Sequence, residues 1–264
     1  MIIVLNLWGG LCNQISDLYY AINYFININI NYTINCCTFR DDNNIELFFF
    51  KKYHNLFNKN ILSSCKNYII YENIKDKINN KNNLNINKID LNKEILDKYI
   101  IKYKHKDVFL FIENFYKINL FLKEVYFNFN FFVKPNIKIL KIYNFIKNKI
   151  LQKKYNFIHL RFENDFKKIF GTENIFNLDY IIKNIKFKNN YKIYLACSDI
   201  SKILNNKNRG TYLYKDDLIK NFNLNFEEKA FIDLLIGKYS EEFYGNRKSS
   251  FSLVLSILKN TKNF

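Results

Sequence analysis

The sequence predicts an α/β fold with parallel sheets, and two observations lead to this prediction. Short apolar runs of strand length alternate with stretches in which apolar residues recur every three or four positions. The alternation continues through both halves of the 264-residue chain, and no repeat of fixed period interrupts it. Alternating strands and helices are typical of α/β domains with parallel sheets.

The N-terminal residues predict a strand, a glycine turn and a helix in that order. Ile2–Leu7 is an apolar run, and Gly9 and Gly10 follow it. Helical spacing then relates Ile15, Leu18, Tyr19, Ile22, Phe25 and Ile26. This order opens many nucleotide-binding domains, because it places backbone N–H groups and a helix N-terminus at the end of a strand. The alternative is a plain turn in which Asn13 caps the helix.

The middle of the chain carries fewer signals. Residues 58–107 are the least informative, and their asparagine-rich segments of low complexity, such as residues 78–83, are predicted to be loop or insertion. Val108–Ile112 has the pattern of a buried strand, whereas residues 115–132 have no assignable pattern.

Pro135, the only proline, marks the predicted domain boundary. It precedes a helical pattern whose apolar positions are Ile137, Leu140, Ile142, Phe145, Ile146 and Ile150. We therefore expect an N-terminal domain at residues 1–134 and a C-terminal domain at residues 135–264.

The second half predicts further strands and helices in alternation. Strands are expected at Tyr155–Leu160, Tyr191–Ala196 and Glu242–Tyr244, and helices at Asn177–Ile185, after Asn225, and after Ser249 or Ser250. Asn225 suits a helix N-cap, and the acidic residues Glu227 and Glu228 in the first turn favour the helix dipole.

Composition and charge narrow the classes of function. Hydrophobic residues make up 48% of the chain, which argues against general disorder. The net charge of +17 comes from lysines scattered among asparagines, which favours a solvated basic surface over a nucleic-acid groove. Only four residues are arginines, Arg40, Arg161, Arg209 and Arg247. Each one matters because a guanidinium grips phosphate in two places.

The sequence gives little support for disulfide bonds, a zinc site, a signal peptide or a membrane segment. The five cysteines are odd in number and form no Cys-x-x-Cys, so neither a disulfide framework nor a zinc site is predicted. No signal peptide and no run of eighteen apolar residues is seen, and we expect a cytoplasmic protein without a membrane segment.

The segment from His159 to Asp165, His-Leu-Arg-Phe-Glu-Asn-Asp, carries the strongest chemical signal. Alternate strand residues share a face, so His159, Arg161 and Glu163 point the same way near the carboxyl end of a strand. Open α/β sheets bind ligands at that edge, where an arginine neutralises a diphosphate leaving group. The alternative is a structural ion pair of Arg161 with Glu163 or Asp165.

Two glycine-containing segments are candidate phosphate sites. Gly9–Gln14 lets the backbone approach a ligand closely, but it is neither a P-loop nor the dinucleotide fingerprint. Gly245–Ser252 places a turn, two basic residues and three hydroxyls before a helix. The alternative for Gly245–Ser252 is a serine cap beside a solvated basic turn.

These three segments together resemble the GDP-fucose-dependent fucosyltransferases, above all the protein O-fucosyltransferase family and its plant relatives. The family's Gly-x-x-Asn-Gln turn is matched by Gly10–Gln14, although Cys12 stands where glycine is common. Its middle motif His-Leu-Arg-Phe-Glu-x-Asp is matched at every fixed position from His159 to Asp165. Its closing pattern is matched by Phe231–Leu234, Phe243–Asn246 and Ser249–Phe251.

The resemblance implies a GT-B-like fold, with two Rossmann-like domains and the donor in the cleft between them. It implies GDP-fucose as the donor, a glycan or protein hydroxyl as the acceptor, inversion at the anomeric carbon, and no cofactor or metal. The sequence contains no Asp-x-Asp of the kind that metal-dependent transferases use.

The resemblance also assigns roles to residues of this chain. Arg161 binds the β-phosphate and stabilises the departing GDP, and Asn13 lies beside the sugar and the acceptor. His159 supports the nucleotide site, and Asp233 approaches the guanine. Further substrate contacts are expected from Gly9, Gly10, Glu163, Asp199, Asn246, Ser249, Ser250 and Phe251.

Several alternatives remain open at the level of sequence. The acceptor proton is taken by a carboxylate, of which Asp165 is the first candidate beside Glu163 and Asp17, or by the leaving phosphate. The donor is alternatively another nucleotide-deoxysugar, such as a rhamnosyl nucleotide. The two other functions considered are a basic nucleic-acid-binding protein and a catalytically silent relative that binds only a partner.

Overall fold

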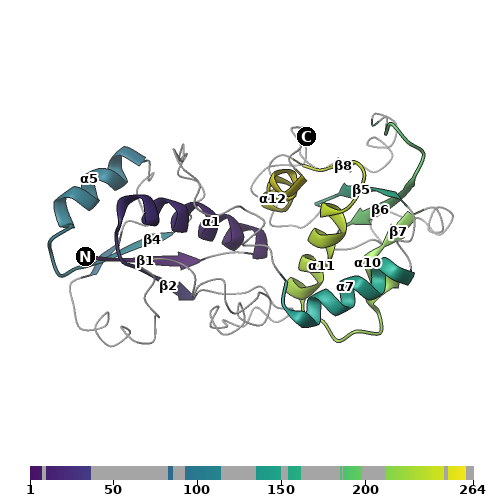
Figure 1. The fold of residues 1–264 in the computed structure, drawn as a ribbon, viewed down its shortest axis with the longest axis horizontal. Coiled ribbons are helices and arrows are strands. Elements are labelled where there is room, and N and C mark those ends of the chain that lie inside the picture. The colour runs from purple at the N-terminus through teal and green to yellow at the C-terminus, as the bar shows by residue number, and fades with distance from the viewer. Residues whose placement is uncertain are drawn as a thin grey trace. The chain divides into compact units, whose positions relative to one another are not determined.

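The computed structural model describes residues 1–7, 10–36, 83–85, 93–113, 135–149, 154–161, 185, 187–197, 212–246 and 249–259. The chain forms two compact units, an N-terminal unit of Met1–Ile137 and a C-terminal unit of Lys138–Phe264. Each unit is built on its own parallel sheet, of which the described residues include four strands (Figure 1). This is the α/β class that the sequence predicts.

The sheet of the N-terminal unit has the strand order β2-β1-β4-β3. Its strands are β1 (Ile2–Leu7), β2 (Tyr32–Cys36), β3 (Asn83–Asn85) and β4 (Phe109–Glu113), and all their pairings are parallel. Because β1 lies between β2 and β4, the side chains of Ile3, Val4, Leu5 and Leu7 are all fully buried. The apolar run at the N-terminus is therefore a central strand, as predicted.

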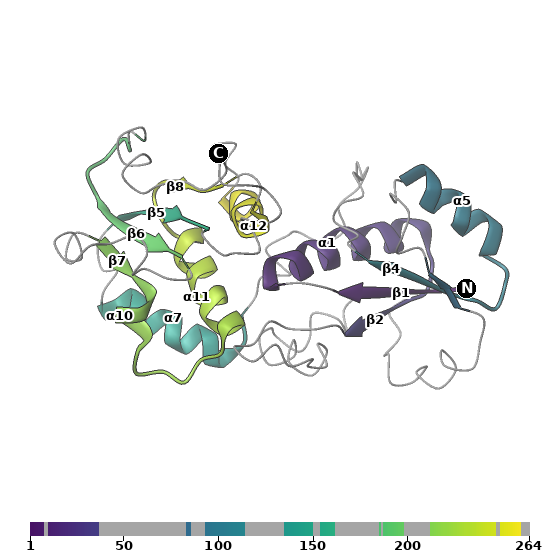
Figure 2. The same ribbon diagram turned by 180° about the vertical axis from the view of Figure 1, so that it is seen from behind.

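Helix α1 (Leu11–Ile28) connects β1 to β2 and lies along the sheet in Figures 1 and 2. Its core-facing residues recur at helical spacing and are almost fully buried: Ile15, Leu18, Ala21, Ile22 and Phe25. Because both strands run parallel, the helix is a crossover that starts at the carboxyl end of β1.

Residues 58–107, in which the sequence indicates no helix or strand, contain two elements in the structure. The structure has strand β3 and helix α5 (Lys93–Tyr103) there. Helix α5 buries Leu96 and Ile100, which are one turn apart, while Ile101 is 77% exposed. The Tyr24 hydroxyl of α1 donates to Asp97 of α5, which ties the two helices together. The asparagine-rich composition conceals this short amphipathic helix.

The sheet of the C-terminal unit has the strand order β7-β6-β5-β8, again with parallel pairings. Its strands are β5 (Tyr155–His159), β6 (Lys192–Ala196), β7 (Tyr212–Tyr214) and β8 (Phe243–Tyr244). Both faces of β5 are covered, because Phe157 and Ile158 point to opposite faces and are both fully buried. The predicted strands at 155–160, 191–196 and 242–244 are confirmed within one residue at each end.

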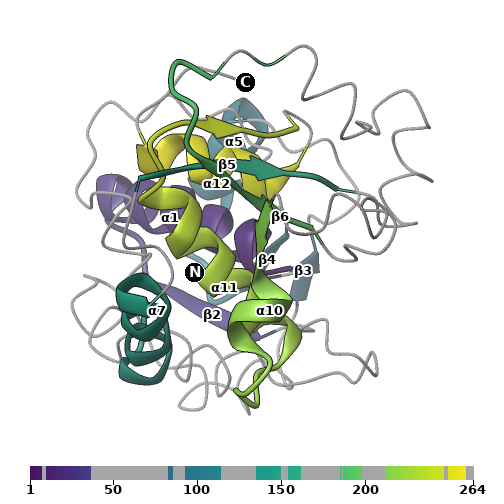
Figure 3. The same ribbon diagram turned by 90° about the vertical axis from the view of Figure 1, so that its right-hand side faces the viewer.

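The helices of this unit are α7 (Ile137–Lys149), α10 (Lys215–Ile219), α11 (Phe226–Lys238) and α12 (Ser250–Lys259). Helix α11 packs on β5 and α12 packs on α11, as Figure 3 shows. Gly237 permits this close packing, because a Cβ there would lie 2.6 Å from Leu255 Cδ2 and 3.1 Å from the Phe157 ring. The helix predicted at Asn177–Ile185 lies outside the described residues except for Ile185.

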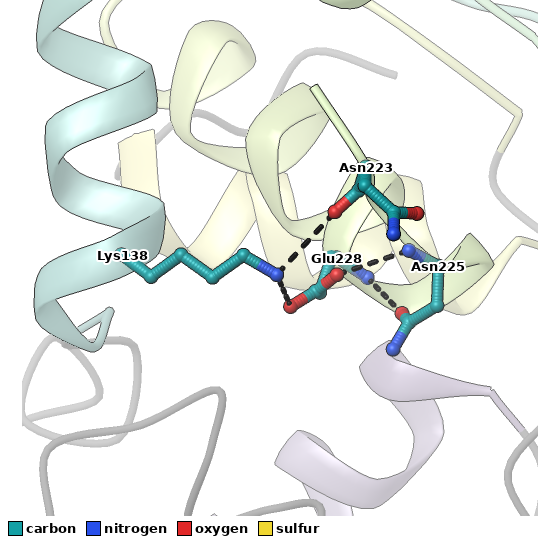
Figure 4. Close-up of polar contacts among 4 residues, drawn as sticks. All are labelled: Lys138, Asn223, Asn225 and Glu228. Carbon is teal, nitrogen blue, oxygen red and sulfur yellow. Dashed lines mark hydrogen bonds and ion pairs between the residues drawn. The ribbon is translucent and has the colours of Figure 1, made fainter.

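Helix α7 departs from its predicted apolar face. Its pattern buries Ile139, Ile142 and Ile146, but Ile137 is 72% and Leu140 is 42% exposed. An isoleucine-rich composition thus places apolar residues on the solvated face as well. The Lys138 ammonium at the start of α7 lies 2.6 Å from Glu228 Oε1 of α11 (Figure 4).

Candidate functional site

The carboxyl end of β5 holds the two residues to which the sequence gave most weight. His159 is the last residue of β5 and is 8% exposed, and Arg161 lies two residues beyond it, half-buried. The Leu160 amide donates to the Ala196 carbonyl at 2.9 Å, so the backbone stays paired with β6 up to this point. Arg161 therefore lies at the sheet edge where parallel α/β sheets bind ligands.

His159 joins the end of β5 to the start of α12. Its Nδ1 lies 2.8 Å from the Ser252 hydroxyl, and its ring stacks on the Phe251 ring at 4.4 Å between centroids. Phe251 in turn stacks on Phe157 of β5, with centroids 6.4 Å apart. Two of the segments that carry the resemblance, the one that starts at His159 and the one at the start of α12, are thus adjacent in space.

The electrostatics of this edge keep His159 neutral. Burial, together with the charges of Arg161 and Lys215, lowers the pKa of His159 to about 3. A neutral imidazole has one N–H donor and one acceptor nitrogen. His159 can therefore orient a ligand by hydrogen bonding near neutral pH, but it does not supply a positive charge there.

Lys215 lies close to this candidate site and was not singled out from the sequence. It is the first residue of α10, directly after β7, and its side chain is 14% exposed. Its ammonium lies 2.9 Å from Asp233 Oδ2, and the Tyr194 hydroxyl donates to Asp233 Oδ1 at 2.5 Å. The signal that would have identified Lys215 is a charged residue directly after a strand. That strand, Tyr212–Tyr214, is too short to be predicted from its pattern.

The predicted role of Asp233 as a guanine contact therefore concerns a carboxylate that already has two partners. Asp233 is 4% exposed within α11, and both its oxygens are engaged by Tyr194 and Lys215. This arrangement fixes the carboxylate firmly beside the ends of β6 and β7. A guanine that binds to Asp233 would therefore share this carboxylate with the Tyr194 hydroxyl and the Lys215 ammonium.

The N-terminus of α12 carries a buried hydroxyl. Ser249 directly precedes α12, is 1% exposed, and its carbonyl accepts from the Leu253 amide at 3.0 Å. Its side-chain oxygen has no hydrogen-bond partner among the described residues. The Ser249 amide donates to the carbonyl of Asn246, which is 4% exposed. A hydroxyl and the first amides of a helix form a site of the kind that binds phosphate.

The glycine turn lies in the N-terminal unit and is described within it. The Gly10 carbonyl accepts from the amides of Asn13 and Gln14 at 3.0 and 3.3 Å, so Gly10 is the residue at which α1 begins. Asn13 is partly exposed in the first turn, whereas Gln14 is fully buried. Asp17, one of the carboxylates considered as a base, is also fully buried in this unit.

Four predicted site residues, Gly9, Glu163, Asp165 and Asp199, lie outside the described residues. Within the described part of the chain, no group of three or more His, Cys, Asp or Glu residues is arranged to hold a metal ion. No helix in that same part has the length and apolar character needed to span a membrane.

Comparison with known proteins gives similarity in structure but none in sequence. No protein-family model matches the chain, and no curated protein matches it. A crystal structure of POFUT1 in complex with GDP-fucose is similar at a TM-score of 0.60 and 11% sequence identity, over 99% of this chain and 96% of that one. A POFUT1 structure in complex with GDP gives a TM-score of 0.58, also at 11% identity and over 99% and 96% of the two chains.

A third similar structure comes from a bacterium. The fucosyltransferase NodZ from Bradyrhizobium matches at a TM-score of 0.58 and 11% identity, over 97% of this chain and 93% of that one. The matches cover nearly the whole length of both partners, so the similarity extends over the entire fold. The chain therefore has the GT-B-like α/β fold of these fucosyltransferases, as its three sequence motifs predict.

Proposed function

We propose that the chain is a glycosyltransferase that takes fucose from GDP-fucose and transfers it to a hydroxyl of a glycan or protein. The observation that carries the proposal is the arrangement at the end of β5, where Arg161 and His159 lie beside the start of α12. The fold supports it, because proteins with this fold have been solved with GDP and GDP-fucose bound.

In this proposal the C-terminal unit binds the donor. Arg161 grips the β-phosphate with its planar guanidinium, and Ser249 and Ser250 hold phosphate oxygens at the N-terminus of α12. Phe251 and His159 line the nucleoside, and Asp233 contacts the guanine from its place beside Lys215. Further donor contacts come from Glu163, Asp199 and Asn246.

The N-terminal unit serves the acceptor in the same proposal. Asn13, partly exposed in the first turn of α1, lies beside the sugar and the acceptor hydroxyl, and the backbone of Gly9 and Gly10 approaches them closely.

The proposed reaction inverts the anomeric carbon. The acceptor oxygen attacks C1 of fucose from the face opposite GDP, the bond from C1 to the β-phosphate oxygen breaks, and GDP leaves with the electron pair. Arg161 stabilises the charge that develops on the leaving phosphate, an effect worth about 3–4 kcal/mol for one well-placed donor. The acceptor proton passes to Asp165 or to the departing phosphate.

Metal independence is part of the proposal, because the guanidinium takes the place that a divalent cation has in Asp-x-Asp transferases. The sequence contains no Asp-x-Asp that would hold such a cation.

GDP release from GDP-fucose in the presence of a panel of glycan and peptide acceptors tests the function. We expect release that is unchanged by EDTA and lost in Arg161→Ala. The control is Lys154→Ala, which removes an exposed cation just before β5, at the opposite end of the same strand. Release from a GDP-rhamnose donor alone would reassign the sugar, and release from UDP-sugars alone would refute the GDP site.

A further inference from the structure

Ser252 lies in α12 at the end of the candidate phosphate segment Gly245–Ser252, has no role of its own in the proposed function, and touches His159 directly. The Ser252 side chain is fully buried, and its Oγ lies 2.8 Å from Nδ1 of His159. The other histidine nitrogen, Nε2, lies on the far side of the ring from this bond. The hydroxyl either donates to Nδ1 or accepts from it, and each direction of this bond corresponds to one tautomer of a neutral His159.

We propose that Ser252 is a positioning residue that holds His159 with its ring proton on Nε2, so that His159 donates a hydrogen bond to an acceptor atom of the bound nucleoside diphosphate. The hydrogen bond from His159 to the ligand rests on the proposed function. The position of the ring proton on Nε2 is argued from the contact between Ser252 and His159 and does not depend on that function.

The direction of the hydrogen bond follows from the buried hydroxyl. Ser252 has no other hydrogen-bond partner among the described residues. If Nδ1 carried the proton and donated to Oγ, the hydroxyl proton would stay buried without an acceptor in that part of the chain, at a cost of about 1–3 kcal/mol. When the hydroxyl donates to Nδ1, the bond is satisfied and the ring proton lies on Nε2.

A neutral ring makes this choice matter. Burial and the neighbouring charges of Arg161 and Lys215 lower the pKa of His159 to about 3, so the ring carries a single proton near neutral pH. The stacked Phe251 ring fixes the plane of the imidazole at the same time. Orientation and protonation are thus both set before a ligand binds.

Gly245 provides an independent observation for the same arrangement. A Cβ at position 245 would lie 2.4 Å from Ser252 Oγ and 2.7 Å from the Phe243 ring. Such distances are too short for any larger residue without displacement of the hydroxyl. Gly245 therefore leaves room for the Ser252 hydroxyl at the position from which it contacts Nδ1 of His159.

The test reads the tautomer directly by nitrogen NMR of the full-length protein. The chain has three histidines, so the substitutions His54→Gln and His105→Gln leave His159 as the single signal. In this background we expect a protonated Nε2 and an unprotonated, hydrogen-bonded Nδ1. Ser252→Ala should lose the Nδ1 bond and give a mixture of tautomers.

Ser256→Ala is the matched control. Ser256 lies one turn further along α12, is 5% exposed, and donates to the Leu253 carbonyl at 2.7 Å instead of to a ring. We expect its spectrum to equal that of the parent. A proton on Nδ1 in the parent, or an unchanged tautomer in Ser252→Ala, overturns the proposal. The parent spectrum decides the matter even where Ser252→Ala does not fold.

A second arm measures GDP affinity by calorimetry. Ser252→Ala should weaken GDP binding about threefold to tenfold, the loss of one hydrogen bond, and Ser256→Ala should leave it unchanged. A shifted tautomer with unaltered GDP affinity refutes the positioning role. If the parent binds no GDP at all, the proposed function fails, while the tautomer result still stands or falls by itself.

Discussion

His159 shows how one buried residue makes stability depend on pH. Its pKa in the folded state is lowered to about 3 from the ordinary histidine value of 6.5, first by burial and then by the charges of Arg161 and Lys215. The unfolded chain therefore binds a proton that the folded chain excludes. The contribution of neutral His159 to the free energy of unfolding is complete above about pH 6.5. It is lost as the pH falls toward 3, because protonation then favours the unfolded state.

The prediction concerns the free energy of unfolding measured in urea at pH 7.5 and 5.5. The wild type should lose stability between these pH values through His159, with a slope of up to about 1.4 kcal/mol per pH unit below pH 6.5. His159→Gln should flatten that slope, because glutamine does not titrate. Equal slopes in the two proteins would show that the histidine titrates in the folded state as it does in the unfolded one.

The buried pair of Asp233 and Lys215 is the second feature at this scale. Asp233→Asn removes the negative charge that Lys215 faces, and both side chains are largely buried. We expect a loss of about 3 kcal/mol in the free energy of unfolding. The double variant Asp233→Asn, Lys215→Met should recover part of that loss, because no uncompensated ammonium remains. Strictly additive losses would contradict the coupling.

At the residue scale, the sequence predicted the position of a side chain where its chemistry stood out. Arg161 stood out as one of four arginines, and it lies just beyond the carboxyl end of β5, where the pattern put it; its role stays a prediction. Lys215 did not stand out among the many lysines, because what distinguishes it is burial beside Asp233, a tertiary property. Ser252 was likewise one serine of a serine-rich segment until the structure placed it against His159.

Helix α11 shows how an element is fixed by its first turn. The Asn225 side chain accepts from the Glu228 amide at 2.9 Å, and the Glu228 carboxylate accepts from the Asn225 amide at 3.0 Å, which is a capping box. Lys138 of α7 reaches the other oxygen of Glu228 and lies 3.5 Å from the Asn223 carbonyl, as Figure 4 shows. The cap thus also links two helices of the C-terminal unit.

Removal of this cap gives a prediction for the element. Asn225→Ala should lower the free energy of unfolding by about 1 kcal/mol, since an amide of the first turn loses its acceptor. The control is Asn221→Ala in the exposed turn before α11, for which we expect a change within about 0.5 kcal/mol. Urea denaturation of the three proteins compares them. Equal effects of the two substitutions would show that the cap contributes nothing.

At the level of elements, sequence patterns predicted the long and strongly apolar segments. Strands β1, β4, β5 and β6 and helices α1, α7, α11 and α12 lie where their patterns indicated. Strands β3 and β7 have three residues each and form by pairing with strands that are distant in sequence. No local sequence pattern therefore predicts them. Strand β2 alternates polar and apolar residues in an asparagine-rich context and was missed as well.

The whole molecule has two units, each with a parallel sheet, and a net charge of +17. Its fold matches fucosyltransferases at 11% identity, far below the level at which aligned sequences reveal relationship. The order of three short motifs predicted that fold because each lies at a strand end or helix start, where backbone geometry restricts the residue types. The net charge of +17 is a property of the composition as a whole, so it indicated neither the fold nor the position of a site.

The central claim is that the C-terminal unit binds a guanine nucleotide through Arg161. Thermal unfolding of the wild type, Arg161→Ala and the control Lys154→Ala, titrated with GDP, GDP-fucose and UDP without metal, tests it most directly. A ligand at one hundred times its Kd stabilises the folded state by about 2.7 kcal/mol, a shift of several degrees for a chain of this size. We predict that GDP and GDP-fucose stabilise the wild type and Lys154→Ala but not Arg161→Ala. No GDP effect in the wild type, or an equal effect in Arg161→Ala, would contradict the account.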